Sequence, residues 1–459
     1  MTRLALAIPG SGPDPAAVGI ALLAAMAEQG LRVQHFRSWA CPIGTRAIGA
    51  LTGLPGRHLD AWLMPPEVCR SVFARGTQSA DLAIIEGTIE TIPRPLAATS
   101  SYEESCTSTC GRPGALMPLA EALDAPIVAA ISCDWLKRFH LPFLPSRVEA
   151  VILDGLCDRR EFADMRRMVE LVLGRPVLGA LPALAEVRAA LQDAPRDCPL
   201  DPCVVASLVS GFRQFSDLEA LRELACSRPL PPLFDAEALV PTGPRFKVAY
   251  AHDDAFGDYF PDTLETLEAL GAELVEFSPL SDGDLPPGVD LVMIGCGFPD
   301  RFAEELSANA CLIASLRAWV CRGRPVFAEG GGCAYLGRLM RLGDWNVPGV
   351  GVFPFDAALL PNPEPPTPVS RTLIRSGMLG EAGTVLRGYH SNRWKLLPAP
   401  EPDDCSARSG YLTAEHDVCF RRNAFGSLIH LHLAAMPQVV SGFAGLGRHG
   451  QKAPLFGGP

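Results

Sequence analysis

The sequence contains no apolar run long enough to cross a membrane and no run of basic residues. A membrane-spanning helix needs about 18 consecutive apolar residues, and the N-terminus enters an expected strand without the leader of an exported protein. Asp and Glu outnumber Lys and Arg by 51 to 40, which gives a formal net charge of -11. An acidic chain without a basic patch is poorly suited to nucleic acid or an anionic membrane. We therefore expect a cytoplasmic protein that binds neither.

Charged residues are also few, at 20% of the 459 residues, whereas 48% are hydrophobic. This balance excludes a disordered chain, because enough apolar surface is available to form cores. A single core rarely grows to this length, so two domains are expected. The 15 cysteines would stay reduced in the cytoplasm, as free thiols, ligands or packing residues rather than disulfides.

Apolar segments of the first half alternate with helical patterns, which indicates βαβ units on a parallel sheet. Residues 16–29 form an expected helix that ends at Gly30, a residue suited to a left-handed helix cap. Residues 229–244 are rich in proline and are predicted to form a linker, so the first domain spans residues 1–228. The expected strands are residues 4–8, 32–36, 82–86, 127–131, 150–153 and 177–180.

The same alternation starts again in a second domain, residues 245–459. Its expected helices are residues 261–270 and 311–322, each followed by glycine. Its expected strands are residues 246–251, 274–277, 291–294 and 326–328. Two α/β domains in series are therefore predicted.

Motifs in both halves have the order and spacing of one known family. The second half contains K-V-A-Y-A-H-D-D-A-F-G at 247–257, I-G-C-G-F-P-D at 294–300, A-E-G-G-G-C-A-Y-L-G at 328–337, L-R-G-Y-H at 386–390 and G-S-L-I-H-L-H at 426–432. The first half contains G-L-R-V-Q-H-F at 30–36, T-G-L-P-G-R-H-L-D-A-W-L at 52–63, I-I-E-G at 84–87 and G-R-P-V-L-G-A-L-P at 174–182. Along nearly its whole length the chain resembles the glutamine-dependent cobyrinic acid (hydrogenobyrinic acid) a,c-diamide synthase family.

The resemblance implies a fold and a reaction. The fold is a dethiobiotin-synthetase-like, P-loop-type parallel sheet domain followed by a class I glutamine amidotransferase-like α/β domain. In that family the second domain hydrolyses glutamine, and the ammonia amidates the a and c acetate side chains of a corrinoid acid. ATP and magnesium activate that acid in the first domain.

The phosphate-binding loop of the family is altered in this chain. Such a loop binds phosphate with backbone N–H groups, a Lys and a hydroxyl that holds magnesium. Gly10 and Gly12 remain as candidate ligand-binding residues, but Pro15 stands at the Lys position and Ala16 at the hydroxyl position. Pro13 and Pro15 also remove two N–H donors. Binding of ATP in the manner of the family is therefore not expected.

Other nucleotide and substrate positions are changed as well. The resemblance places Arg37 at a Lys position, and Cys41 and Gly44 at two acidic positions. Glu86 is retained in I-I-E-G, and Asp154 replaces an Asn near the nucleotide base. We keep Arg37, Cys41, Glu86 and Asp154 as suspected ligand-binding residues, although Glu86 would also serve as a turn cap.

The glutaminase half lacks its nucleophile. A class I amidotransferase needs a thiol on a strand-to-helix elbow and a nearby His that activates it. The family's E-C-G-G elbow is matched by Glu329, then Gly330 at the nucleophile position. His430 stands at the general-base position, without a thiol at the elbow to activate. Cys333 follows three residues after Gly330, inside the expected helix, and is not assumed to replace it.

Cysteines follow four of the first-domain strands, at the edge where open α/β sheets bind ligands. A speculative metal site would comprise Cys41, Cys106, Cys110 and Cys133, as thiolate ligands of a metal, a cluster or a metallated tetrapyrrole. The alternative is that they are small apolar packing residues, because C-x-x-x-C is not a zinc or ferredoxin spacing.

Two functions remain open. The preferred one is a catalytically degenerate family member that acts as a tetrapyrrole-binding or partner subunit in cobalamin or related tetrapyrrole metabolism. The alternative is an active amidoligase that amidates the a and c acetates of a corrinoid or related tetrapyrrole with an altered nucleophile or free ammonia. The sequence leaves a protein partner and a homodimer open.

Overall fold

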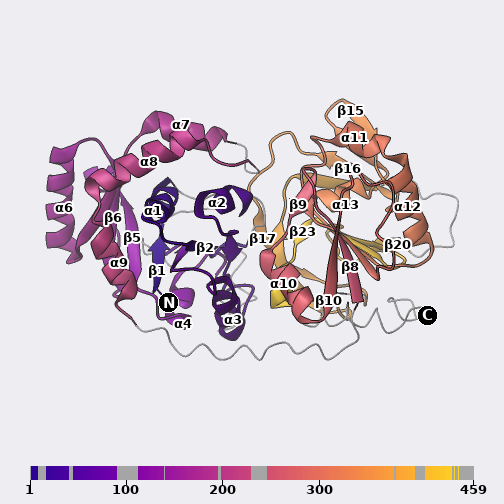
Figure 1. Cartoon of the computed structure of the whole chain (residues 1–459), viewed down its shortest axis with the longest axis horizontal. Coiled ribbons are helices and arrows are strands. Elements are labelled where there is room, and N and C mark those ends of the chain that lie inside the picture. The colour runs from indigo at the N-terminus through magenta and orange to yellow at the C-terminus, as the bar shows by residue number, and fades with distance from the viewer. Residues whose placement is uncertain are drawn as a thin grey trace. The chain divides into compact units, whose positions relative to one another are not determined.

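The computed structural model describes residues 2–8, 17–40, 45–89, 112–138, 140–194, 198–228, 246–376, 379–398, 409–436, 439 and 443 (Figure 1). These residues form two compact units, one before residue 229 and one after residue 245. The expected linker, residues 229–244, lies outside the described part of the chain. Within the described ranges, no helix is both long and apolar enough to span a membrane.

The first unit is built on a parallel sheet of seven strands in the order β3-β2-β4-β1-β5-β6-β7. Its strands are β1 (Thr2–Ala7), β2 (Val33–Arg37), β3 (Arg57–His58), β4 (Leu82–Gly87), β5 (Ile127–Ser132), β6 (Val148–Leu156) and β7 (Val177–Pro182). The central strands read as continuous apolar runs because helices cover both faces of such a sheet. Each strand predicted for this half overlaps an observed strand, and β3 was not predicted.

Helices connect these strands. They are α1 (Ala17–Ala27), α2 (Thr45–Thr52), α3 (Pro66–Gly76), α4 (Met117–Ala122), α5 (Cys133–Lys137), α6 (Arg159–Leu173), α7 (Ala185–Asp193), α8 (Pro202–Phe215) and α9 (Leu218–Cys226). Helix α1 is apolar on all sides and almost wholly buried, partly against α8 (Figure 1). Helix α6 begins after Asp158, whose side chain accepts from the Glu161 N–H, and ends at Gly174 in the left-handed conformation.

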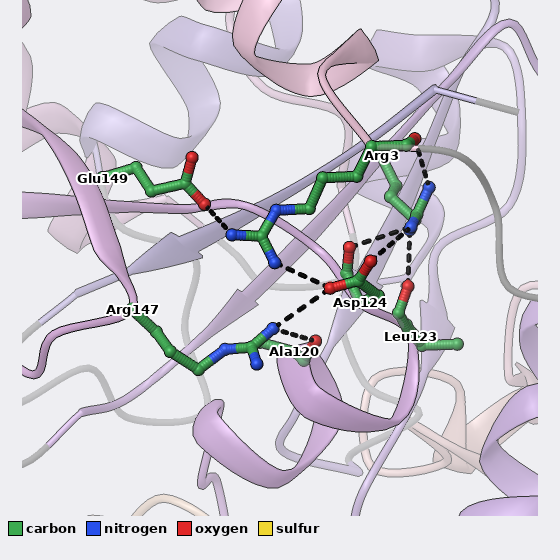
Figure 2. Close-up of polar contacts among 7 residues, drawn as sticks. Arg3, Ala120, Leu123, Asp124, Arg147 and Glu149 are labelled. Carbon is green, nitrogen blue, oxygen red and sulfur yellow. Dashed lines mark hydrogen bonds and ion pairs between the residues drawn. The ribbon is translucent and has the colours of Figure 1, made fainter.

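Charged residues close the amino-terminal edge of this sheet (Figure 2). The side chain of Arg3, fully buried on β1, donates to the backbone carbonyls of Leu123 and Asp124 over 2.5 and 2.8 Å. Arg228, just beyond α9, donates to the Asp124 carboxylate over 2.7 Å and to Glu149 over 2.5 Å. This network joins β1, β6 and the end of α9. The charges of Arg3 and Arg228 are therefore used to hold these elements together.

The second unit contains a seven-stranded sheet in the order β10-β8-β11-β13-β22-β21-β20. Its first five strands are parallel, and β21 and β20 are antiparallel additions. The strands are β8 (Phe246–Ala251), β10 (Ala272–Phe277), β11 (Leu291–Ile294), β13 (Val326–Glu329), β20 (Ser409–Tyr411), β21 (Val418–Arg421) and β22 (Ala424–Ser427). The predicted strands 246–251 and 291–294 coincide with β8 and β11.

Helices and smaller sheets complete this unit. The helices are α10 (Pro261–Ala269), α11 (Ala303–Ala308), α12 (Ala310–Cys321), α13 (Gly331–Tyr335) and the 3-10 helix η1 (Leu433–Ala435). The smaller sheets contain β9 (Phe256–Asp258), β12 (Cys296–Gly297), β14 (Leu339–Leu342), β15 (Trp345–Pro348), β16 (Phe355–Leu359), β17 (Thr367–Thr372), β18 (Val385–His390), β19 (Trp394–Pro398) and β23 (Ile429–His430). The two α/β units agree with the predicted fold class.

Candidate functional site

A sharp elbow joins β13 to α13 in the second unit. Strand β13 ends at Glu329, and Gly330 follows with φ 53° and ψ −115°, a conformation that residues with a side chain rarely adopt. The next turn lies against the end of β11, because a Cβ on Gly332 would come 2.2 Å from the Ile294 carbonyl oxygen. The elbow expected from the sequence is therefore present as a backbone shape, with no side chain at its tip.

His430 lies beside this tip. It belongs to β23, which pairs with β18 through Tyr389, and a Cβ built on Gly330 would lie 3.0 Å from the His430 Cε1 atom. Burial lowers the pKa of His430 to about 3, and the charge of His390 adds to this effect. The imidazole is therefore neutral near pH 7, and it lies beside Gly330; its role as a general base stays a prediction.

Sequence reasoning missed a thiol at this point. Cys296 lies on β12, and its Sγ atom is 2.8 Å from the Nδ1 atom of His430. The same Sγ atom would be 3.3 Å from a Cβ on Gly330. The available signal was a cysteine between two glycines in the motif I-G-C-G-F-P-D. That signal is weak, because Cys296 lies 34 residues before the elbow and outside the E-C-G-G motif that carries the nucleophile in the family.

Glu329 ties the two sides of the site together. Its Oε1 atom accepts a hydrogen bond of 2.9 Å from the Leu431 N–H, next to His430. Burial raises the pKa of this carboxyl group to about 8, and the backbone hydrogen bond opposes that rise. Glu329 is therefore largely protonated at pH 7, and it positions the His430 strand against the elbow.

Cys333 belongs to the core. It is fully buried on α13, and its Sγ atom would lie 2.9 Å from a Cβ on Gly426. The thiol of Cys333 forms a hydrogen bond with the thiol of Cys419. Burial and, to a lesser extent, this hydrogen bond raise the pKa of Cys419 well above its usual value. These contacts give Cys333 a packing role with Cys419.

In the first unit, the retained carboxylate has a partner from the protein itself. Glu86 lies near the carboxyl end of β4, and its Oε2 atom is 3.1 Å from the Nε2 atom of His35 on β2. Both side chains are buried, and a Cβ on Gly19 of α1 would approach the same oxygen to 3.0 Å. The carboxylate is thus enclosed between β2 and α1.

Arg37 lies near Glu86 at the same edge of the sheet. Both residues line a small hollow together with Ser38, Trp39 and Gly114. Its volume is about 10 Å³, which is about the room that one water needs. Within the described residues, this hollow is too small for a phosphate group.

Asp154 also has a partner. It lies near the end of β6, and its Oδ1 atom forms an ion pair of 2.5 Å with Arg188 on α7. A larger hollow of about 780 Å³ opens beyond the same strands, at the carboxyl ends of β6 and β7. It is lined by residues that include Cys157, Asp158, Leu184, Gly211 and Gln214.

Several suspected ligand residues lie outside the described part of the chain, namely Gly10, Gly12, Cys41, Cys106 and Cys110. Cys133 is described at the start of α5, buried with Ile131 and Leu136. Burial, more than neighbouring charge, raises the pKa of its thiol to about 12. Within the described ranges, no group of three or more His, Cys, Asp or Glu side chains is arranged to hold a metal ion.

Comparisons with known proteins match the second unit and also the chain over most of its length. The family described as "CobB/CobQ-like glutamine amidotransferase domain" matches residues 247–437. The chain is 31% identical over 345 residues to a cobyrinate a,c-diamide synthase of Priestia megaterium, with 73% of this chain and 72% of the relative covered. A cobyrinate a,c-diamide synthase of Syntrophotalea carbinolica is 27% identical over 469 residues, with 96% and 97% covered. That of a Listeria monocytogenes strain is 29% identical over 448 residues, with 94% and 96% covered.

Proposed function

The chain belongs to the cobyrinate a,c-diamide synthase family, and we propose that it is a degenerate member that binds a tetrapyrrole acid in cobalamin metabolism without amidating it. The observation that carries this proposal is the buried pair between Glu86 and His35. ATP-dependent amidation requires carboxylates at the carboxyl ends of the strands that are open to magnesium and phosphate. Here Glu86, the carboxylate retained from the family at that edge of the sheet, contacts the imidazole of His35.

Two further features support the loss of ATP chemistry. Asp154, at the position assigned to the nucleotide base, is engaged by Arg188. Pro15 and Ala16 replace the Lys and the hydroxyl of the phosphate loop. Charge-assisted hydrogen bonds to phosphate contribute roughly 1.5–3 kcal/mol each, so the loss of several removes most of the affinity for ATP.

A tetrapyrrole acid remains a suitable ligand because guanidinium side chains can bind its carboxylates without magnesium. Arg37, Arg57 and His58 are gathered at the ends of β2 and β3, where Arg37 pairs in register with His58. Guanidinium groups bind carboxylates with two parallel hydrogen bonds. In this proposal Arg37 contacts an acidic side chain of the tetrapyrrole.

A titration of the purified chain with cobyrinic acid tests the proposal, followed by the absorbance of the corrinoid. We expect saturable binding that weakens at least tenfold in Arg37→Gln and is unchanged in the control Arg213→Gln. Arg213 is suitable because it is exposed and pairs only loosely with Glu28 at the surface. We also expect no magnesium-dependent ATP binding by calorimetry at millimolar nucleotide.

The alternative is an active amidoligase with an altered nucleophile or free ammonia. The thiol of Cys296, which lies 2.8 Å from Nδ1 of His430, supports this alternative. The two functions differ in one measurement. Incubation with cobyrinic acid, ATP, magnesium and ammonium salt yields an a- or c-amide only if the synthetase half is active. Detection of that amide by mass spectrometry would refute the degenerate reading.

A further inference from the structure

The thiol of Cys296 lies in the space that a side chain at the elbow would enter. A Cβ on Gly330 would be 3.3 Å from the Sγ atom of Cys296 and 3.7 Å from its Cβ atom. The two residues approach from different elements, because Cys296 lies on β12 and Gly330 follows β13. The elbow has no side chain at position 330, and the thiol of Cys296, from β12, faces the same point.

Hydrogen bonds hold this thiol in place. The adjacent Gly295 N–H donates to the Tyr259 hydroxyl oxygen over 2.9 Å, and that hydroxyl donates to the Ala251 carbonyl over 3.0 Å. Burial raises the pKa of Tyr259 well above its usual value, so it remains a donor. On the other side, a Cβ on Gly297 would collide with the Ala255 carbonyl oxygen at 2.0 Å. The β12 backbone is therefore fixed on both sides of Cys296.

His430 provides a proton acceptor for the thiol. Its Nδ1 atom is 2.8 Å from Sγ. Its Nε2 atom is buried, and among the described residues it has no hydrogen-bond partner. A buried ring nitrogen without a partner costs free energy in a closed core, so this atom points to a group that binds in the site. Proton transfer from Sγ to Nδ1 forms two opposite charges at contact distance, which offsets the cost of a lone buried imidazolium.

We propose that Cys296 is the nucleophile of the second unit and that His430 is its base, acting on a primary carboxamide such as the side chain of glutamine. The thiol forms a C–S bond to the carbonyl carbon while its proton moves to Nδ1 of His430. The C–N bond then breaks, and the proton passes to the departing nitrogen, which leaves as ammonia. Water hydrolyses the thioester, yields the carboxylic acid and restores the thiol.

This inference concerns the second unit alone, so it stands or fails independently of the proposed loss of amidation. A first experiment uses the full chain and a glutamine-derived chloroketone, followed by peptide mass spectrometry. We expect the adduct on Cys296, with protection by excess glutamine. Labelling confined to exposed thiols such as Cys157 and Cys311, with Cys296 unmodified, would overturn the inference.

A second experiment measures glutamate release from glutamine without ATP or corrinoid. We expect slow release that falls at least tenfold in Cys296→Ser and in Cys296→Ala. The control Cys333→Ser changes a buried thiol of the same unit outside the site, so it reports on folding and should retain the release. Release that survives both Cys296 variants, or no release from the unmodified chain, contradicts the inference.

Discussion

The Nε2 atom of His35 lies 3.1 Å from the Oε2 atom of Glu86, and both side chains are buried at the carboxyl edge of the first sheet. The pair joins neighbouring strands, because His35 on β2 lies in register with Ile84 on β4, two residues before Glu86. A carboxylate in such a place needs a hydrogen-bond donor from the protein or a bound cation. In this chain the imidazole of His35 is one hydrogen-bonding partner of that group. The contact therefore links the position of Glu86 to the stability of the sheet.

His35→Ala should therefore destabilise the protein. The substitution removes a partner of the buried Glu86 carboxylate, and an under-satisfied buried polar group costs about 1–3 kcal/mol. Urea unfolding followed by circular dichroism measures the change. His140→Ala is the matched control, because His140 is exposed and such substitutions usually stay within about 0.5 kcal/mol. Equal stability of the two variants would show that the pair is not a structural link.

The pH dependence of stability should carry the signatures of Glu329 and His430. The pKa of Glu329 rises from its ordinary value of 4.5 to about 8 in the folded chain, so the folded state holds a proton that the unfolded state has lost. This contribution is complete below about pH 4.5 and is lost as the pH rises towards 8. The pKa of His430 falls from 6.5 to about 3, so its contribution has the opposite sign and is lost as the pH falls from 6.5 to 3.

Between pH 4.5 and 6.5 these two contributions oppose each other, and between pH 6.5 and 8 Glu329 acts alone. We expect the free energy of unfolding to decrease across pH 6.5–8 by at most about 1.4 kcal/mol per pH unit. Glu329→Gln keeps the acceptor for the Leu431 N–H but cannot ionise, so its slope in this range should be smaller than that of the unmodified chain. Identical slopes in urea titrations of the two proteins would exclude a buried, protonated Glu329.

The sequence predicted β2, β4 and β13, which carry His35, Glu86 and Glu329, but it did not predict the short strands β12 and β23, which carry Cys296 and His430. Strands such as β8 and β11 are buried in a parallel sheet, so they read as short apolar runs bounded by turn residues. The small sheets between β14 and β19 were not predicted. Their strands are short and partly exposed, as β17 illustrates with no fully buried residue, and such segments leave little periodic signal.

The candidate sites were predicted unevenly. Glu329, Gly330 and His430 were found because they belong to motifs with a known order in the sequence. Cys296 and His35 were missed because their importance comes from partners 134 and 51 residues away. A contact between distant segments depends on the register of the sheets, which one sequence does not state.

The network at the amino-terminal edge of the first sheet gives a stability prediction. Arg3 is fully buried, and its guanidinium donates to the carbonyls of Leu123 and Asp124. Arg3→Ala leaves these carbonyls without that donor, at about 1.5–3 kcal/mol for each charged hydrogen bond. We expect a loss of about 3 kcal/mol or more in urea unfolding. The control Arg213→Ala breaks only an exposed ion pair with Glu28 and should cost less than about 1 kcal/mol; similar losses would contradict the structural role of the network.

Gly330→Cys gives a geometric test of the elbow. Disulfides favour Cβ–Cβ distances of about 3.8 Å, and a Cβ at position 330 would lie 3.7 Å from the Cβ of Cys296. Under oxidising conditions we expect a disulfide between the introduced thiol and Cys296, detected by peptide mass spectrometry. In reductant the variant should melt below the unmodified chain, because a side chain at φ 53° costs roughly 1–2 kcal/mol.

The double substitution Gly330→Cys with Cys296→Gly separates crowding from conformation. It places one thiol at the elbow and removes the second, so no disulfide can form there, whereas the conformational cost at position 330 remains. Its melting temperature should therefore be insensitive to reductant, unlike that of Gly330→Cys. If the single variant instead forms no disulfide and keeps two free thiols after oxidation, the two positions do not face each other as described. The elbow and β12 would then have a different register, and the contact between Cys296 and His430 would have to be revised with it.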